Sequence, residues 1–113
     1  MSFEIIYSDS ALTDLRSIYR YIATELLAPD AAKHISESIM SAVESLAEMP
    51  SRNPTYGKEP WKSRGLRKLI VDNFIVFYLP IEHTKQVLIV TIMYGKRNVE
   101  NVLNEIEIET EKR

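Results

Sequence analysis

The sequence of 113 residues lacks cysteine, contains only three glycines and one tryptophan, and carries a formal net charge of -2. The absence of cysteine excludes a disulfide scaffold and any zinc or redox site built from thiolates. The apolar runs are far shorter than the roughly 18 residues that a membrane span needs. The chain also opens without a basic and then apolar leader segment, so we expect a cytoplasmic protein with no membrane partner.

The composition predicts one globular domain that covers residues 1–113. Hydrophobic residues make up 45% of the chain. A chain of this length buries about two thirds of the surface that its unfolded form exposes, which is enough for a core without disulfides or a structural metal.

Motifs for metal binding and nucleophilic catalysis are missing. His34 and His83 stand far apart in the sequence and have no carboxylate at a ligand spacing. We therefore interpret both as surface histidines and expect no metal and no cofactor. The chain also contains no nucleophile elbow, no glycine-rich phosphate loop and no Ser-His-Asp set.

Positive charge is concentrated in one segment of the chain. Residues 1–51 carry eight acids and three bases, residues 52–68 carry six bases and one acid, and residues 69–113 carry seven acids and five bases. A basic segment inside a nearly neutral chain indicates either an anionic partner or a solvated loop that balances the acidic helices.

The first half of the chain has the periodicity of a strand and then of two helices. Phe3, Ile5 and Tyr7 occupy alternate positions, as in a short strand. Two apolar stripes follow at three- and four-residue spacing, comprising Leu12, Leu15, Tyr19, Ile22 and Leu26 in the first and Ala32, Ile35, Ile39, Ala42, Leu46 and Met49 in the second. The break at residues 28–30 is so short that the two helices must run antiparallel.

The second half of the chain predicts strands and a short helix. Residues 50–65 contain too many prolines and glycines for a long regular element. The predicted strands cover residues 66–71, 74–79 and 87–94, with turns at residues 72–73 and 80–85. Asn98 can cap a final short helix that carries Val99, Val102, Leu103 and Ile106.

The predicted order of elements is therefore β, α, α, β, β, β, α. It indicates an α+β fold in which an antiparallel helical hairpin packs on one face of a mainly antiparallel four-stranded sheet. We expect the other face of the sheet to remain open and to carry the function.

A cluster of cationic and aromatic residues is the main candidate for that function. It comprises Arg52, Tyr56, Lys58, Trp61, Lys62, Arg64, Arg67 and Lys68, with Tyr94, Lys96 and Arg97 at the end of the last strand. Cations neutralise phosphates and aromatic rings stack on bases, so the cluster suits single-stranded nucleic acid. For Trp61 the alternative is an anchor that pins the loop onto the sheet. Arg67 and Lys68 are neighbours on a strand, so they cannot both face one cleft.

The order and spacing of several motifs resemble the RelE/ParE superfamily, the toxins of bacterial type II toxin-antitoxin modules. The resemblance covers about residues 3–104, and its motifs include Tyr7, Asp14-Leu15, Tyr21-Ile22, Arg64-Gly65-Leu66-Arg67-Lys68-Leu69, Val71-Asp72-Asn73-Phe74 and Tyr94-Gly95-Lys96-Arg97. It implies the fold of this superfamily, a helical hairpin over an antiparallel sheet.

The resemblance implies one of two activities. RelE-like members cleave mRNA on the ribosome, whereas ParE-like members bind DNA gyrase and poison it. For RNA cleavage the resemblance assigns catalysis to Arg97, Arg67, Lys68 and Tyr94. Two further positions of the RNase fall on Ile75, where RelE-like toxins use an arginine, and near Leu103, where they use a tyrosine. Neither side chain can replace those groups, and losing a transition-state charge partner typically costs about a hundredfold in rate.

We therefore expect a growth-arresting toxin of a plasmid-stabilisation module that binds gyrase in the ParE manner. The residues assigned to target or nucleic-acid binding are Trp61, Lys62, Arg64, Lys96 and Arg97. The alternatives are a metal-independent, ribosome-dependent mRNA endoribonuclease and a non-toxic relative that only binds antitoxin. All three imply a cognate antitoxin on the toxin's apolar and basic surface, and contact with operator DNA only through that antitoxin.

Overall fold

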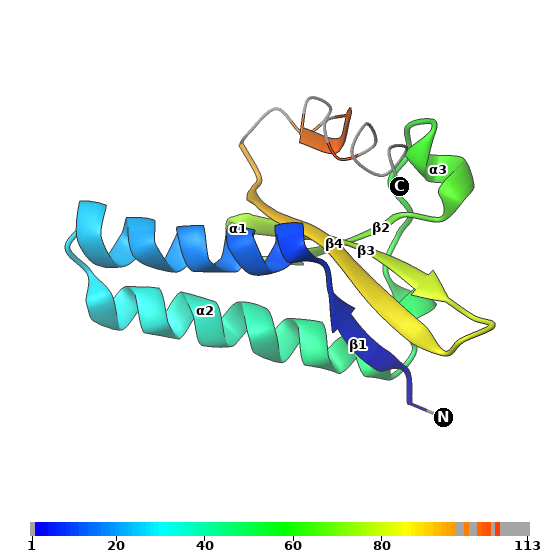
Figure 1. The fold of residues 1–113 in the computed structure, drawn as a ribbon, viewed down its shortest axis with the longest axis horizontal. Helices are drawn as coiled ribbons and strands as arrows, with labels where there is room; N and C mark the ends of the chain where they lie inside the picture. Colours follow the sequence, from blue (N-terminus) through cyan, green and yellow to red (C-terminus); the bar gives the residue numbers. More distant parts are fainter. Residues whose placement is uncertain (1, 97–98, 100–101, 105, 107–113) are drawn as a thin grey trace.

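The computed structural model describes residues 2–96, 99, 102–104 and 106, in which helices pack on a four-stranded sheet (Figure 1). The helical elements are α1 (Asp9–Arg20), the π-helical turn η1 (Tyr21–Glu25), α2 (Pro29–Glu44), the 3-10 turns η2 (Ser45–Ala47) and η3 (Pro50–Arg52), and α3 (Trp61–Arg64). The strands are β1 (Glu4–Tyr7), β2 (Arg67–Val71), β3 (Phe74–Ile81) and β4 (Gln86–Tyr94). Residues 99, 102–104 and 106 are helical as well, as predicted for the end of the chain.

The two predicted long helices form an antiparallel hairpin (Figure 1). Ser8 caps α1, because its Oγ accepts a hydrogen bond from the N–H of Ala11 at 3.0 Å. η1 continues α1 directly, and Pro29 then begins α2, where a missing proline N–H costs no hydrogen bond. Both helices and the break between them are therefore confirmed.

The strand order of the sheet is β1-β4-β3-β2. β1 runs parallel to β4, while β4 and β3, and β3 and β2, are antiparallel neighbours. The mainly antiparallel four-stranded sheet of the sequence analysis is confirmed. The connection from β1 to its parallel neighbour β4 runs through the helical hairpin, α3, β2 and β3, which is long enough for a parallel pair.

The two hairpin turns of the sheet differ in how well they were predicted. Asp72 lies between β2 and β3 with a φ of 53°, the left-handed conformation expected for this turn. The next turn begins later than predicted, because β3 continues through Pro80, which pairs with Val87 of β4. Since β2 pairs no further than the residue opposite Tyr78, Pro80 has no strand on its other side that would need an N–H donor.

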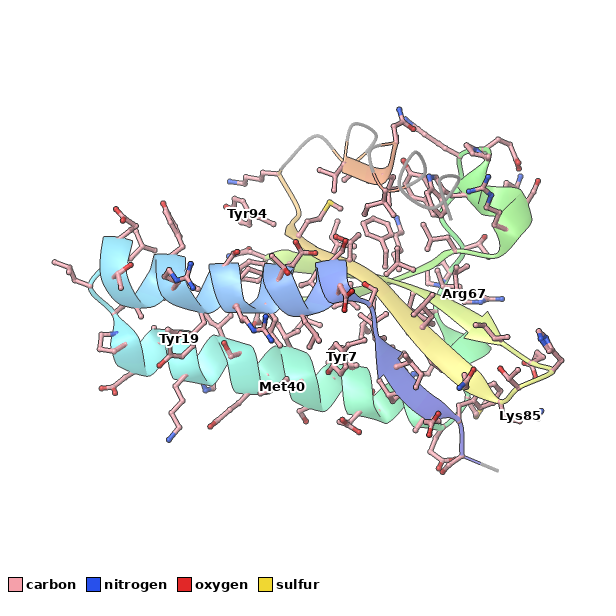
Figure 2. All side chains as sticks on the ribbon, in the orientation of Figure 1. Tyr7, Tyr19, Met40, Arg67, Lys85 and Tyr94 are labelled. Atoms are coloured by element: carbon pink, nitrogen blue, oxygen red, sulfur yellow. The ribbon has the colours of Figure 1, made fainter. Side chains whose placement is uncertain are left out.

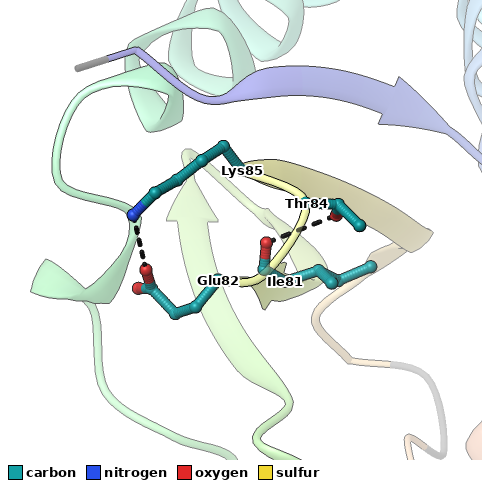
Figure 3. A network of polar contacts seen from close by, with 4 residues as sticks. All are labelled: Ile81, Glu82, Thr84 and Lys85. Atoms are coloured by element: carbon teal, nitrogen blue, oxygen red, sulfur yellow. Dashed lines mark hydrogen bonds and ion pairs between the residues drawn. The ribbon is translucent and has the colours of Figure 1, made fainter.

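The turn between β3 and β4 is fixed by two polar contacts (Figure 3). The Lys85 ammonium lies 3.2 Å from a Glu82 carboxylate oxygen, and the Thr84 hydroxyl donates a hydrogen bond to the carbonyl of Ile81 at 3.5 Å. Both members of the ion pair are exposed, so the pair contributes little to stability.

The helical hairpin covers one face of the sheet and forms the first core. The buried residues of this core are Ala11, Ile39, Val43 and Leu46 from the helical layer and Val76, Tyr78, Val87, Ile89 and Ile92 from the sheet. Ile5 and Tyr7 of β1 and the preceding Phe3 pack against it, as their alternation predicted.

The opposite face of the sheet is covered as well, so the expectation of an open face was wrong. Trp61 of α3, Leu66 and Leu103 form a second core with Phe77, Val90 and Met93 of the sheet. The Tyr56 ring adds an edge-to-face contact with Phe77 at a centroid distance of 5.6 Å. β3 and β4 have apolar side chains on both faces, and each face of a central strand must be covered.

Candidate functional site

Two arginines of the basic segment hold the chain that follows α2. Arg52 donates hydrogen bonds from Nη1 to the carbonyls of Ser45 at 2.9 Å and Glu48 at 2.7 Å, and so satisfies carbonyls at the end of the helical layer. Arg67 donates from Nη1 to the carbonyl of Asn53. Part of the positive charge in residues 52–68 therefore serves the fold.

Three residues predicted to bind a target lie on α3. The Trp61 ring is only 4% exposed and belongs to the second core, which agrees with its alternative interpretation as an anchor. The Arg64 guanidinium lies 5.1 Å from the centroid of this ring, and Lys62 is exposed. In this conformation the buried Trp61 has no free face on which a base can stack, whereas the two cations border the surface.

The residues predicted for RNA cleavage are spread along the sheet. Arg67 pairs with Tyr78 at one end of the ladder between β2 and β3, and Tyr94 pairs with Phe74, four residues away along β3. At roughly 3.3 Å per residue, Tyr78 and Phe74 are about 13 Å apart along β3, and the strands that carry Arg67 and Tyr94 lie on opposite sides of β3. Lys68 pairs with Phe77 of the second core, and so it lies on the face opposite to Arg67, as strand alternation predicted.

The end of β4 carries the remaining candidates. Lys96 is exposed, and Tyr94 is 39% exposed with its ring 5.8 Å from that of Phe74. Arg97 lies outside the described residues.

Ile75 and Leu103, which the resemblance places at or near the arginine and tyrosine positions of RelE-like toxins, belong to one apolar cluster. Leu103 is 1% exposed within the second core, and Ile75 packs against the same cluster. Ile75 is also close to Gly95, where an added Cβ would lie 3.6 Å from the Ile75 side chain. Hydrocarbon therefore fills the space that a catalytic guanidinium and a phenol would need.

The described surface contains a groove that the sequence analysis missed. It lies between the helical hairpin and the end of the sheet where β3 begins and β4 ends, and its volume is about 670 Å³. Its lining includes Ser17, Ile18, Tyr21, Leu26, Ala31 and Ile35 from the hairpin and Phe74, Met93 and Tyr94 from the sheet. Figure 2 shows Tyr94 beside α1, and Figure 1 shows the hairpin extending past the sheet. A sequence signal existed, because the apolar stripe continues to Leu26 at the far end of the hairpin.

Asp14 lies at the base of this groove and joins α1 to β4. One of its carboxylate oxygens accepts hydrogen bonds from the Thr91 hydroxyl at 2.7 Å and the Ile92 N–H at 3.0 Å. The groove therefore has a fixed polar group among apolar walls, an arrangement that ligand-binding sites and active sites share.

Tyr78 forms the polar centre between the sheet and the segment after α2. Its hydroxyl donates to the carbonyl of Pro50 at 2.6 Å and accepts from the Asn53 side chain at 3.1 Å. Burial raises the pKa of Tyr78 above its ordinary value, and burial together with the nearby Glu44 carboxylate raises the pKa of Tyr7.

The described part of the chain offers no group of three or more acidic or histidine side chains that could hold a metal ion. None of its helices has the length and apolar character needed to cross a bilayer.

Comparison with known proteins identifies relatives of this chain. A family model described as "ParE toxin of type II toxin-antitoxin system, parDE" matches residues 5–99. No curated protein matches the sequence.

Solved structures of bacterial toxins share the fold. A chain of the chromosomal ParDE system of P. aeruginosa superposes with a TM-score of 0.69 at 20% identity, covering 84% of this chain and 98% of that one. A chain of the RelBE2 toxin-antitoxin complex of Mycobacterium tuberculosis gives 0.59 at 15% identity, with 83% and 99% covered. The toxin RelE of E. coli in the free state gives 0.60 at 14% identity, with 100% and 98% covered.

Proposed function

Because the chain belongs to the ParE toxin family of type II toxin-antitoxin systems, we propose that it arrests growth by binding DNA gyrase, without cleaving RNA. The observation that supports this proposal is the second core. Ile75 packs against it and Leu103 is buried in it, at the positions where the RNase branch needs a cation and a proton donor. A buried apolar cluster does not readily accept a charge, so these positions contribute packing and not catalysis.

The geometry of the remaining candidates argues in the same direction. General acid-base catalysis needs its groups within hydrogen-bond reach of one reacting atom. The β3 partners of Tyr94 and Arg67 are about 13 Å apart, and Lys68 lies on the other face of the sheet. A toxin that acts by binding needs no such convergence, and the apolar groove suits it.

Two assays test the proposal, one on the purified protein and one in cells. In a supercoiling assay we expect the toxin to inhibit gyrase, and the toxin bound to its antitoxin is the matched inactive control. In cells that express the toxin, primer extension on mRNA should show no new 5′ ends. Unimpaired supercoiling combined with new 5′ ends would establish the ribosome-dependent endoribonuclease instead. Normal growth at strong expression would identify a non-toxic relative.

We propose that the partner of this chain is an antitoxin. An acidic segment of the antitoxin would lie on the basic surface of this chain. The cations proposed to contact it are Lys62 and Arg64 of α3 and Lys68 of β2, whereas Arg67 holds the backbone of Asn53 and is not included. Operator DNA would be contacted only through the antitoxin.

The double variant K62E/K68E tests this placement. We expect weaker antitoxin binding, with a loss that shrinks as salt is added. K33E reverses one exposed lysine on α2 and is the control for each of the single changes K62E and K68E. Equal affinities of K62E/K68E and K33E would show that the antitoxin binds elsewhere.

A further inference from the structure

The turn between η1 and α2 presents two consecutive leucines to solvent. Leu26 is 56% exposed and Leu27 is 82% exposed, and Tyr21 in the turn before them is 56% exposed. Figure 1 shows this turn at the far end of the hairpin, beyond the sheet. We call residues 21–30 the hairpin tip. Leu26 and Tyr21 also line the groove, so the tip continues its apolar wall outward.

Leu27 has a backbone conformation that disfavours leucine. Its φ is 52°, and the hydrogen bonds from Leu26 N–H to Tyr21 at 3.2 Å and from Ala28 N–H to Ile22 at 3.0 Å close the helix end around it. Helices that end in this left-handed way usually place glycine there, because a Cβ is strained. The Leu27 side chain covers little of the fold, so its strain is not offset by burial within this chain.

The charges around these leucines define what kind of surface can cover them. Glu25 and Asp30 flank the leucines and are exposed, and the nearest bases, Arg20 and Lys33, lie about one turn farther back along the two helices. Like charge disfavours nucleic acid, an anionic lipid surface and an acidic antitoxin segment. A protein pocket that is apolar inside and positively charged at its rim is complementary to this tip.

We propose that the hairpin tip is the element by which the toxin binds its protein target, with Leu26 and Leu27 inserted into an apolar pocket bordered by positive charge. This rests on the proposed function, in which that target is gyrase. In this arrangement the acidic tip contacts the target, and the basic segment contacts the antitoxin.

The variant L27G tests the proposal, with M49G as its matched control. Met49 also has a φ of 52° and is 74% exposed, but it follows η2, at the far end of α2 from the tip. Glycine relieves the same strain at both positions, so the thermal midpoints of both variants should be at or above that of the wild type. We expect L27G to need about tenfold more toxin for half-inhibition of supercoiling and for growth arrest, and M49G to match the wild type.

Antitoxin affinity and a second variant complete the test. L27G should bind the antitoxin as tightly as the wild type. L27N is the second variant, because asparagine also tolerates the left-handed conformation, and it should show the same loss of toxicity. It replaces L27G in the test if L27G does not fold. Undiminished toxicity of L27G and L27N, or an equal loss of antitoxin binding, would overturn the proposal. If the wild type arrests growth without inhibiting gyrase, the gyrase assignment is wrong. The tip is then still tested by comparing growth arrest by L27G with growth arrest by the wild type.

Discussion

Asp14 of α1 accepts a hydrogen bond from the backbone N–H of Ile92 in β4 at 3.0 Å. β1 pairs with β4 only as far as Tyr7 opposite Ile89, so the next part of this edge of β4 has no strand beside it. The Ser8 hydroxyl satisfies the carbonyl of Val90 at 2.8 Å, and Asp14 satisfies the following donor. The side chains of the cap residue Ser8 and of Asp14 therefore satisfy the edge of β4 beyond β1, and they fix α1 against the sheet beside the groove.

Replacement of Asp14 by alanine should destabilise the protein by about 3 kcal/mol, because it leaves the Ile92 N–H and the buried Thr91 hydroxyl without an acceptor. Urea denaturation measures this loss. Glu37→Ala removes an exposed carboxylate from α2 and should change stability by no more than about 0.5 kcal/mol. Indistinguishable midpoints for the two variants would show that Asp14 does not support β4.

Replacement of Arg52 by alanine should lower stability by about 1 kcal/mol, since the carbonyls of Ser45 and Glu48 lose their donor. Lys62→Ala, which removes the same charge from an exposed position on α3, should leave the urea midpoint unchanged. If the two substitutions lowered the urea midpoint equally, stability would depend on the charge of the segment and not on the hydrogen bonds of Arg52 at the helix end.

The fold was predictable because its long elements have clean periodicities. The stripe from Leu12 to Leu26, the break before Pro29 and the alternation of Phe3, Ile5 and Tyr7 placed the first three elements. The direction of β1 relative to β4 was not predictable in the same way, because strand pairing depends on contacts between residues far apart in the chain.

The site was less predictable because side-chain roles depend on neighbours that the sequence does not reveal. Arg52 and Arg67 look like ligand-binding cations in the sequence, yet both hydrogen-bond to backbone carbonyls. Trp61 and Leu103 belong to a second core that the two-layer expectation left out. The groove arises from the relative lengths of the hairpin and the sheet, which are known only once the two are packed.

Replacement of Ile75 by arginine restores the residue type of the RNase branch and should not restore its activity. We expect a loss of about 2 kcal/mol, because the charge enters a half-buried position against the second core. Ile70→Arg is the control, since Ile70 pairs with Ile75 on the neighbouring strand but is 66% exposed. New mRNA 5′ ends in cells that express I75R, absent with I70R, would revive the endoribonuclease.

Tyr78→Phe should cost about 1.5 kcal/mol at pH 7, because it removes the hydroxyl that bonds to Pro50 and Asn53. This difference should shrink at alkaline pH. Burial raises the pKa of Tyr78 in the folded protein, so above about pH 10 the unfolded chain loses the Tyr78 proton first. The unfolded state then binds fewer protons than the folded state, and stability falls as pH rises. The phenylalanine variant lacks this proton, and so its urea midpoint should decline less than that of the wild type between pH 9 and pH 11. If the urea midpoints of the two proteins declined in parallel, the loss of stability at alkaline pH would come from other groups. Tyr7, whose pKa is also raised, would then be the first residue to replace.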